Sequence, residues 1–306
     1  MNSRMPHALT IDAEDWSAVM CAYAGREIPA SPQFGSTIHH LLDLLDEHQV
    51  RATFFVVAKH AADAPEPIRA IVACGHELAS HGWAHAKAKT FAAAAYREDL
   101  HRNVQTLQDL TGQRIFGHRA PFFSVTPADT KGAEAAGALE AAADEGLEYD
   151  SSIATLLWHR LGYSIPDQPF VFKLPSGATL VEFPIPARKV GPLTVRLIGG
   201  RGIRLAPASV CLGHLRDLEQ AGLPAMMYVH SYEIARDRLA AGVPRSIGRH
   251  RLAIAAAACG FEVGRGRMVR LVRRMLADHR WAPAHDVIAR LRDESRLLTF
   301  EWPRPA

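Results

Sequence analysis

The sequence predicts an α/β fold built on a parallel barrel of about seven strand–helix units. Short apolar segments rich in β-branched and aromatic residues alternate with segments of helical periodicity, a pattern typical of βα units around a parallel sheet. No Gly/Ser-rich linker divides the 306 residues, which favours one domain over residues 1–306. Acids, histidines and an arginine directly follow several apolar segments. In a parallel barrel the carboxyl ends of the strands meet on one face, where active sites lie.

The first half of the chain alternates the two kinds of segment. The run over 51–57 lacks strict polar alternation, as in a strand buried on both faces. Ser36 can cap a helix whose apolar face includes Ile38, Leu41 and Leu45. The predicted elements are a strand over 7–12, a helix from Ser36, a strand over 51–57, a helix from Pro67 to Gly75 and a strand over 76–80.

The second half repeats the pattern with longer connections. We expect the irregular segment 153–176 and the glycine-rich segment 199–202 to roof a groove. The predicted elements are a helix lined by Leu100, Val104 and Leu107, a segment over 114–121, an alanine-rich helix from Thr126 and Pro127 to near Gly146, a segment over 147–152, a strand over 179–185, a helix over 210–221 and a strand over 224–230.

The composition narrows the class of protein. A net charge of +3 argues against nucleic acid as the main partner. The four cysteines form no CxxC pair and read as buried reduced thiols. No signal peptide precedes the first strand, and no apolar run reaches the ~18 residues of a membrane span, so we expect a cytoplasmic protein. The composition leaves the oligomeric state open.

Basic residues gather in a predicted helical extension from about residue 265. The default interpretation is a solvated helix face. The alternative is a stripe that contacts an anionic membrane or glycan peripherally, formed by Arg267, Arg270, Arg273 and Arg274.

Two histidines and an acidic cluster carry the first chemical signal. His81 and His85 are four residues apart, which places both imidazoles on one side of a helical turn. The cluster that contains Asp12, Glu14 and Asp15 follows the first strand. Two histidines and one carboxylate, with open positions for water, form the ligand set of a hydrolytic zinc site.

Seven motifs occur in a fixed order: TxDxED, ATFFV, GHELASHGWAH, HRAPxFSxT, YDSS, EFP and YVH. With them, residues 9–230, and more loosely the chain to about residue 281, resemble the polysaccharide deacetylase family. This is carbohydrate esterase family four, with its NodB-homology domain, and the resemblance is nearest to the subgroup associated with bacterial exopolysaccharide export. The resemblance implies a distorted (β/α)7 TIM-like barrel that hydrolyses an acetamide on an amino sugar.

The resemblance also implies roles for residues of this chain. Asp12 would be the general base, oriented by Arg119, and Pro121 would shape the groove beside them. His230 would protonate the leaving amine, with Asp150 as its partner. Glu14, His81 and His85 would bind the metal, with Asp15 kept as an alternative acidic ligand. Relatives often have Pro-Trp after the histidine, where this chain has Ser231 and Tyr232, so the sugar pocket differs in shape.

Physical chemistry adds further candidates. After the proline, the backbone N–H of Phe122 is a candidate donor to the oxyanion. Aromatic residues beside the motifs can be core or sugar-stacking walls: Trp16, Trp83, Phe122 and Phe123. Glu182 can be a structural acid or a groove residue. His76 and His118 are expected to make structural hydrogen bonds, and His39 and His40 to lie on a helix surface.

The leading functional hypothesis is a metal-dependent hydrolase that removes the N-acetyl group from an amino sugar in a polysaccharide or lipid-linked glycan. Zn²⁺ is the expected cofactor, with Co²⁺, Ni²⁺ and Mn²⁺ as alternatives. Two other hypotheses stay open, namely an amidase or deformylase that acts on a small or lipid-linked substrate, and a non-catalytic glycan-binding barrel.

Overall fold

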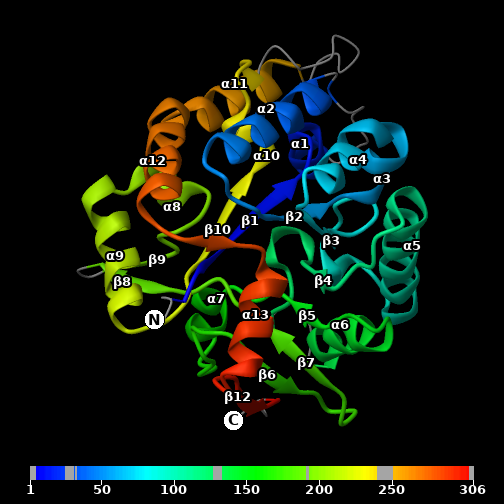
Figure 1. The fold of residues 1–306 in the computed structure, drawn as a ribbon. Coiled ribbons are helices and arrows are strands. Elements are labelled where there is room, and N and C mark those ends of the chain that lie inside the picture. The colour runs from blue at the N-terminus through cyan, green and yellow to red at the C-terminus, as the bar shows by residue number, and fades with distance from the viewer. Residues whose placement is uncertain are drawn as a thin grey trace.

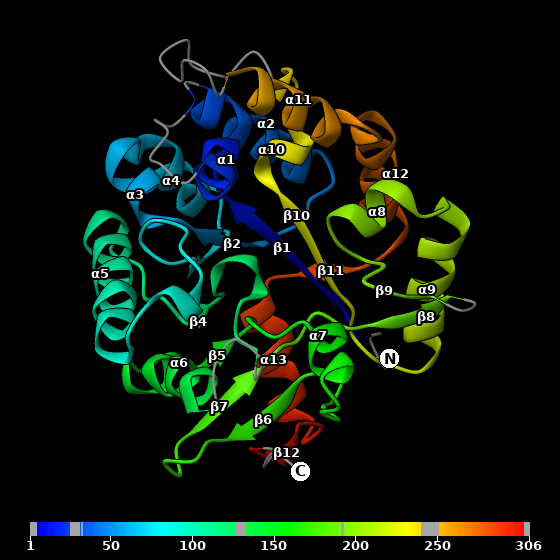
Figure 2. The ribbon, with the colours of Figure 1, turned by 180° about the vertical axis from the view of Figure 1, so that it is seen from behind.

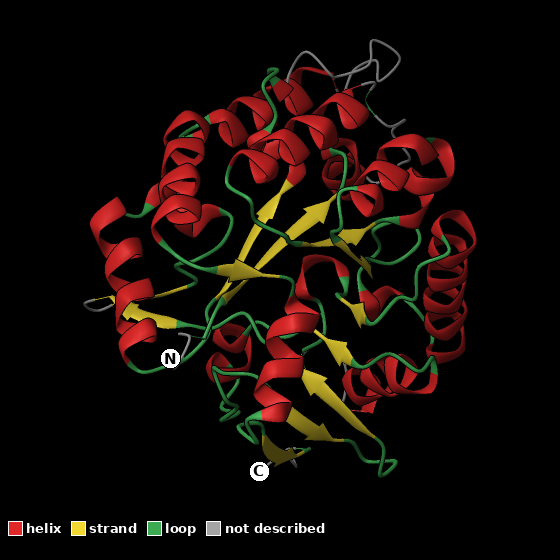
Figure 3. Ribbon diagram, in the orientation of Figure 1, coloured by secondary structure: helices red, strands yellow, loops and turns green. Residues whose placement is uncertain are grey.

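A computed structural model describes residues 5–24, 31, 33–126, 133–190, 193–239 and 251–302. In Figure 1 the strands lie at the centre of the molecule, and Figure 3 shows the helices around them. The strands are β1 (His7–Ala13), β2 (Thr53–Val56), β3 (Glu77–Ser80), β4 (Gly117–His118), β5 (Tyr149–Asp150), β6 (Phe170–Lys173), β7 (Thr179–Glu182), β8 (Arg188–Val190), β9 (Leu193–Val195), β10 (Met226–His230), β11 (Trp281–Ala282) and β12 (Leu298–Glu301).

The helices follow the strands in the alternation that the sequence predicts. They are α1 (Trp16–Ala24), α2 (Gln33–Glu47), α3 (Ala58–Asp63), α4 (Pro65–Ala73), α5 (Ala93–Thr111), α6 (Ala133–Asp144), α7 (Thr155–Arg160), α8 (Arg201–Leu205), α9 (Ala208–Gln220), α10 (Ser231–Ile234), α11 (Arg251–Glu262), α12 (Arg265–Asp278) and α13 (Ala284–Asp293). The expected start of the alanine-rich helix, at Pro127, lies outside the described residues.

The main sheet runs in the order β10-β1-β2-β3-β4-β5-β7-β6-β12. From β10 to β7 every neighbouring pair is parallel, and these seven strands are the seven that the sequence predicts. The prediction of a distorted (β/α)7 NodB-type barrel is therefore confirmed. Strand β6 is antiparallel to β7, and β12 extends that edge. The sequence analysis missed both of these strands.

Both faces of the central strands are buried, which explains their continuous apolar runs. All seven residues of β1 and all four of β2 are buried. Phe54 packs outward with the apolar face of α2, whereas Phe55 packs inward with Tyr149 and Tyr228. The barrel interior is thus filled by large side chains, so a reaction site has room only at its ends.

The C-terminal segment packs against the barrel. Strand β11 and helix α13 lie in front of the central strands in Figure 1 and behind them in the opposite view of Figure 2. Strand β11 pairs with β1. The N–H of Ala284 donates to Thr53, and that of His285 donates to Glu77, at the first residues of β2 and β3. Helix α13 therefore covers the N-terminal ends of the strands. The predicted helical extension did not include these strand pairings.

The basic residues near 265 are partly used inside the fold. Arg265 is buried and donates to backbone oxygens of Glu233, Ala235 and Asp237. Arg267 donates to the backbone oxygens of Arg204 and Ala206. Two members of the proposed stripe pair with acids, because Arg273 contacts Glu47 and Arg274 contacts Asp278. Among the described residues, no helix combines the length and apolar character that a bilayer crossing requires.

The prediction that all four cysteines are buried is wrong for two of them. Cys74 directly follows α4 and Cys259 lies on α11, and both side chains are exposed, whereas Cys211 is buried and Cys21 is half-buried. Each exposed cysteine occupies the solvent side of an amphipathic helix, which the mixed composition of its segment did not reveal.

Candidate metal centre and active site

The chemically loaded residues meet at the C-terminal ends of four strands. Asp12 lies near the end of β1, directly beside His230 of β10 in the sheet register. His81 follows β3, and Arg119 follows β4. Together they line a cavity of about 150 Å³, whose walls are Asp12, Glu14, His81, His85, Arg119, Phe122, Phe123, His230, Tyr232 and Phe261. Parallel pairing alone brings these distant residues to one end of the barrel.

Glu14, His81 and His85 form a buried group with the geometry of a metal site. One ligand atom of each lies within 4.8 Å of the others. His81 Nδ1 lies 2.7 Å from the backbone oxygen of Arg119 and must donate to it, which leaves Nε2 unprotonated and available as a ligand. Burial lowers the pKa of His81 to about 4, against the attraction of Asp12, so the ring is neutral as a ligand must be.

The other two members lie against each other. Nε2 of His85 and Oε2 of Glu14 are in direct contact, as two ligands of one ion are, and His85 Nδ1 is buried without a hydrogen-bond partner among the described residues. His85 has a φ of 56°, a conformation that costs a non-glycine residue free energy and is found at functional sites. Two imidazoles and one carboxylate fit Zn²⁺ or a similar divalent ion with open positions.

Asp15 does not face this group. Its Oδ1 accepts the N–H of Ser17 at 2.8 Å and the N–H of Ser31 at 3.1 Å, so the side chain caps the first turn of α1. Of the two acids that the sequence left open, Glu14 is the one that faces His81 and His85.

Asp12 is paired with a fully buried guanidinium. Arg119 Nη1 lies 2.6 Å from Asp12 Oδ1 and 3.1 Å from Thr10 Oγ1, while Nη2 donates to Ser151 Oγ at 3.0 Å. Burial acts to raise the pKa of Asp12, but the charge of Arg119, together with that of His230, outweighs it and holds that pKa below its usual value. Asp12 is therefore an ionised carboxylate that can accept a proton.

His230 is paired with Glu233, a residue that the sequence analysis did not single out. His230 Nδ1 lies 2.8 Å from Glu233 Oε2, and the same oxygen accepts the His230 backbone N–H at 3.1 Å. Burial acts to lower the pKa of His230, but the Glu233 carboxylate outweighs it and, with Glu14 and Asp12, raises the pKa to about 9. His230 Nε2 faces the cavity, 3.8 Å from Asp12 Oδ2 and 3.7 Å from Glu14 Oε1.

Asp150 is not the partner of His230, which corrects the sequence prediction. Asp150 lies on β5 opposite Glu182 of β7 in the register, and it accepts the N–H and the Oγ–H of Ser152 at 2.7 and 2.9 Å. Burial raises the pKa of Asp150 to about 6. Glu182 accepts the N–H of Ile153. The two acids form a structural pair between neighbouring strands, whereas His230 belongs to β10 at the other end of the strand order.

Two family models match this chain. Residues 29–140 match the model described as polysaccharide deacetylase, and residues 151–289 match a domain of unknown function, DUF3473, which is associated with the exopolysaccharide-linked subgroup. Over residues 29–140 the chain is similar to the polysaccharide deacetylase family, and the resemblance predicted from its motifs is confirmed. Asp12 and Glu14 lie before the first matched range of the family, while His230 lies in the second.

Individual proteins of this family match parts of the chain. A chitooligosaccharide deacetylase from Sinorhizobium fredii is 45% identical over 64 residues, which are 21% of this chain and 28% of that protein. A peptidoglycan deacetylase from Helicobacter pylori is 26% identical over 121 residues, 38% of this chain and 41% of that protein. The chain thus spans less than half the length of these relatives.

Solved structures show the same fold. A presumed polysaccharide deacetylase from Mycobacterium smegmatis has a TM-score of 0.61 at 21% identity, over 100% of this chain and 96% of that one. At this level of identity the likeness concerns the barrel and its connections, and the chemistry of the site rests on the residues described above.

The aromatic candidates divide between the site and the core of this NodB-type barrel. Phe122 is 36% exposed, has a φ of 63°, and places its ring 4.6 Å from that of His85. Phe123 is buried and lines the cavity. Trp83 does not line the cavity, and its ring centroid lies 3.5 Å from the guanidinium carbon of Arg102. Trp16 is buried in a separate apolar cluster.

Other candidates lie near the site without lining it. Pro121 is buried beside Gly82 and does not line the cavity. His118 bonds to Ser80 Oγ and Tyr96 OH, and His76 Nδ1 accepts the N–H of Ala52, so both make the structural contacts expected of them. His39 pairs with Glu66 on the surface, and the ring of Tyr232 stacks on His230, with centroids 5.0 Å apart.

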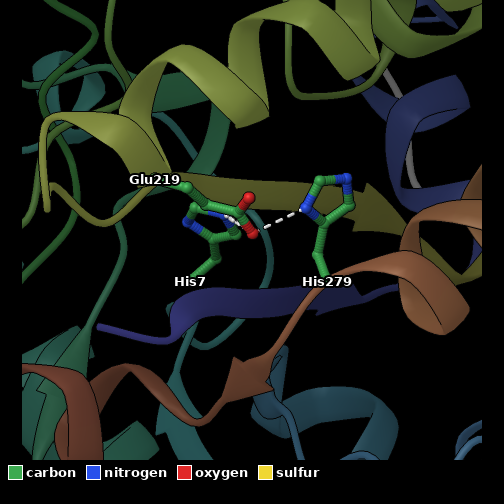
Figure 4. Close-up of side chains that lie close together, drawn as sticks. All are labelled: His7, Glu219 and His279. Carbon is green, nitrogen blue, oxygen red and sulfur yellow. Dashed lines mark hydrogen bonds and ion pairs between the residues drawn. The ribbon is translucent and has the colours of Figure 1, made fainter. Parts of the chain in front are cut away.

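A second group of ligand-type residues lies at the opposite end of β1, shown in Figure 4. The Glu219 carboxylate lies between two imidazoles, 2.8 Å from His279 Nδ1 and 3.6 Å from His7 Nε2. His7 Nδ1 accepts the N–H of Ala225 at 2.9 Å, so the proton of the neutral ring sits on Nε2. That atom cannot bind a metal without placing a proton on Nδ1 against the Ala225 donor. The group therefore clamps β1 to α9 and to the end of α12.

Proposed function

We propose that this protein is a metal-dependent deacetylase that hydrolyses the N-acetyl group of an amino sugar in a glycan. The observation that carries the proposal is that three groups of residues lie together at one cavity. These are the ligand group of Glu14, His81 and His85, the Asp12–Arg119 pair, and the His230–Glu233 pair. Relatives named as chitooligosaccharide and peptidoglycan deacetylases support the same reaction class.

The residues divide the reaction into a basic and an acidic half. A divalent ion such as Zn²⁺ on the three ligands would polarise the amide carbonyl and activate water. Asp12, held ionised by Arg119, takes a proton from the attacking water. His230 faces Asp12 and Glu14 from β10 and delivers a proton to the departing nitrogen as the C–N bond breaks. The products are acetate and a free amine, and Glu233 holds the imidazole in position from its far side.

The size of the cavity suits an acyl group at the end of a larger substrate. A volume of about 150 Å³ is small and accommodates an acetamide group. The sugar would therefore lie at the rim, where the half-exposed ring of Phe122 offers an apolar face for stacking.

The proposal is tested by product analysis and metal analysis on one purified sample. We expect acetate and free amine from an N-acetylglucosamine oligomer, loss of turnover after chelation, and recovery with zinc or cobalt. Formate release from an N-formyl sugar alone would favour a deformylase, and glycan binding without product would favour a non-catalytic barrel. Full turnover in a demonstrably metal-free sample would contradict the proposal.

A further inference from the structure

A second and larger cavity adjoins the metal cavity. Its volume is about 630 Å³, and it shares five lining residues with the smaller cavity. Most of the remaining walls come from β9, α8, α9 and the loops around them. Figures 1 and 2 both place these elements beside β10, the strand that ends at His230. The shared residues are Phe122, Phe123, His230, Tyr232 and Phe261.

The walls of this cavity are mostly apolar, and part of that surface faces water. Leu205 is 61% exposed and Phe122 is 36% exposed, and both line the cavity. Large aliphatic side chains exposed around a concave site mark a place where an apolar ligand binds. A sugar polymer offers hydroxyl groups at every residue and does not match such walls. The further aliphatic lining residues are Leu156, Val195, Leu197 and Val210.

Three arginines line the same cavity, and Glu233 is the acid among its lining residues. Arg204 is 4% exposed, donates to the backbone oxygen of Phe261 at 2.8 Å, and lies 3.6 Å from Glu233 Oε1. Its Nε is buried without a hydrogen-bond partner. Glu233 is already paired with His230. The ion pairs found among the described residues include neither Arg196 nor Arg201, so the cavity carries an excess of positive charge that suits an anionic group.

We propose that this cavity holds the phosphate and the apolar chain of a lipid-phosphate-linked amino sugar, with the acylated nitrogen of that sugar in the metal cavity. The inference rests on the proposed function and names its substrate class. The aliphatic walls bind the chain, and the arginines bind the phosphate. The shared wall at His230 and Tyr232 lets one molecule reach both cavities. Arg204 acts as a positioning residue between the phosphate and Glu233.

The test compares soluble substrates that differ only beyond the sugar. These are N-acetylglucosamine 1-phosphate esters with methyl and octyl chains, an octyl glycoside without phosphate, and an N-acetylglucosamine oligomer. Each buried methylene contributes about a fourfold gain in affinity, so we expect KM for the octyl phosphate to be at least tenfold below that for the methyl phosphate. The octyl glycoside should lie between them. A higher kcat/KM for the oligomer than for the octyl phosphate would overturn the inference while upholding deacetylation.

Matched variants locate the effect. Leu205→Ser should reduce the ratio of KM for the methyl phosphate ester to KM for the octyl phosphate ester. Arg201→Ala should reduce the ratio of KM for the octyl glycoside to KM for the octyl phosphate ester. The controls are Leu161→Ser and Arg270→Ala, which change exposed residues that do not line the cavity and should leave both ratios unchanged. If the control variants changed the KM ratios as much as the cavity variants do, the changes would come from the general loss of a hydrophobic or charged surface residue and not from this cavity.

A binding measurement separates this inference from the proposed function. Titration calorimetry with free octyl phosphate, which carries no sugar, needs no turnover, and inorganic phosphate serves as the comparison. Binding of octyl phosphate that weakens at least fivefold in Leu205→Ser and in Arg201→Ala supports the cavity assignment even if no acetate is released. Absence of octyl phosphate binding at millimolar concentration overturns the assignment, even if the oligomer is deacetylated.

Discussion

Replacement of Glu233 by Gln is the sharpest test of how the acid half of the site works. Glu233 is 2% exposed, and its Oε2 is shared by the ring Nδ1 and the backbone N–H of His230. Gln keeps the shape and one carbonyl acceptor but removes the negative charge. His230 then keeps its place and loses the partner that stabilises its protonated form.

The size of the effect follows from the contact. A hydrogen bond to a charged group contributes about 1.5–3 kcal/mol, and about 1.4 kcal/mol corresponds to a tenfold change in rate. If the whole contribution is realised in proton donation, kcat should fall by roughly 10- to 150-fold. The upper end of this range reaches the lower end of the 10²–10⁴ contribution of general acid catalysis, as expected when the histidine is kept and only its partner is changed. Metal content should stay at the wild-type level, because Glu233 is not among the ligand residues.

The assay compares an amide with an ester. An alkyl amine needs a proton in order to leave, whereas the phenolate of an aryl acetate does not, so Glu233→Gln should slow N-acetylhexosamine hydrolysis and spare aryl acetate hydrolysis. Asp150→Asn is the matched control, and any loss it causes should be equal for the two substrates. Amide turnover within twofold of wild type in Glu233→Gln, or an amide-selective loss in Asp150→Asn, would refute the assignment of Glu233 as the partner of His230.

Three further outcomes are expected. His81→Ala and His85→Ala should lose bound metal by elemental analysis, whereas Asp12→Asn should keep it and lose nearly all turnover; loss of metal in Asp12→Asn would make Asp12 a ligand. Burial lowers the pKa of His118 to about 3, below about 6.5 in the unfolded chain. The unfolded chain therefore binds the proton first, and stability falls as pH drops from about 6.5 toward 3. In urea unfolding, the free energy of unfolding of the wild type should fall between pH 7.5 and pH 5. The fall should be smaller by roughly 2 kcal/mol in His118→Asn. Sedimentation with anionic vesicles should be absent at low salt, because Arg267 and Arg273 are engaged within the fold; salt-sensitive binding would restore the membrane stripe.

The strands of the barrel could be predicted because burial on both faces leaves a strong signal. The runs that became β1 and β2 are mostly apolar, and every residue of both strands is buried. Strands β6 and β12 could not be predicted in the same way. Each extends the sheet edge beyond β7, two residues of β6 are buried, and β12 is largely exposed. Their sequences carry little more than short aromatic segments within loops.

Some residues of the site could be grouped from the sequence and others could not, for a similar physical reason. Residues placed by strand ends, such as Asp12, His81 and Arg119, could be grouped from sequence because a parallel barrel brings all carboxyl ends together. Partners set by strand order could not, and the choice of Asp150 for His230 failed there, since β5 neighbours β7 and not β10.

Glu233 carried a local signal that the motif comparison passed over. It stands three residues after His230, at the third position of a short helix whose first turn its own carboxylate caps. An acid at that position commonly bonds to the residue that opens the helix. When that residue is a histidine, the same oxygen can reach both the backbone N–H and the ring Nδ1, which fixes the tautomer and turns Nε2 toward the site. The residue that caps this helix is thus also the residue that orients the His230 ring. A search for acids in the helical turn that follows each candidate histidine, in addition to the motifs, would have selected Glu233 as the partner of His230. Asp150 would then have been assigned to Glu182 on the neighbouring strand.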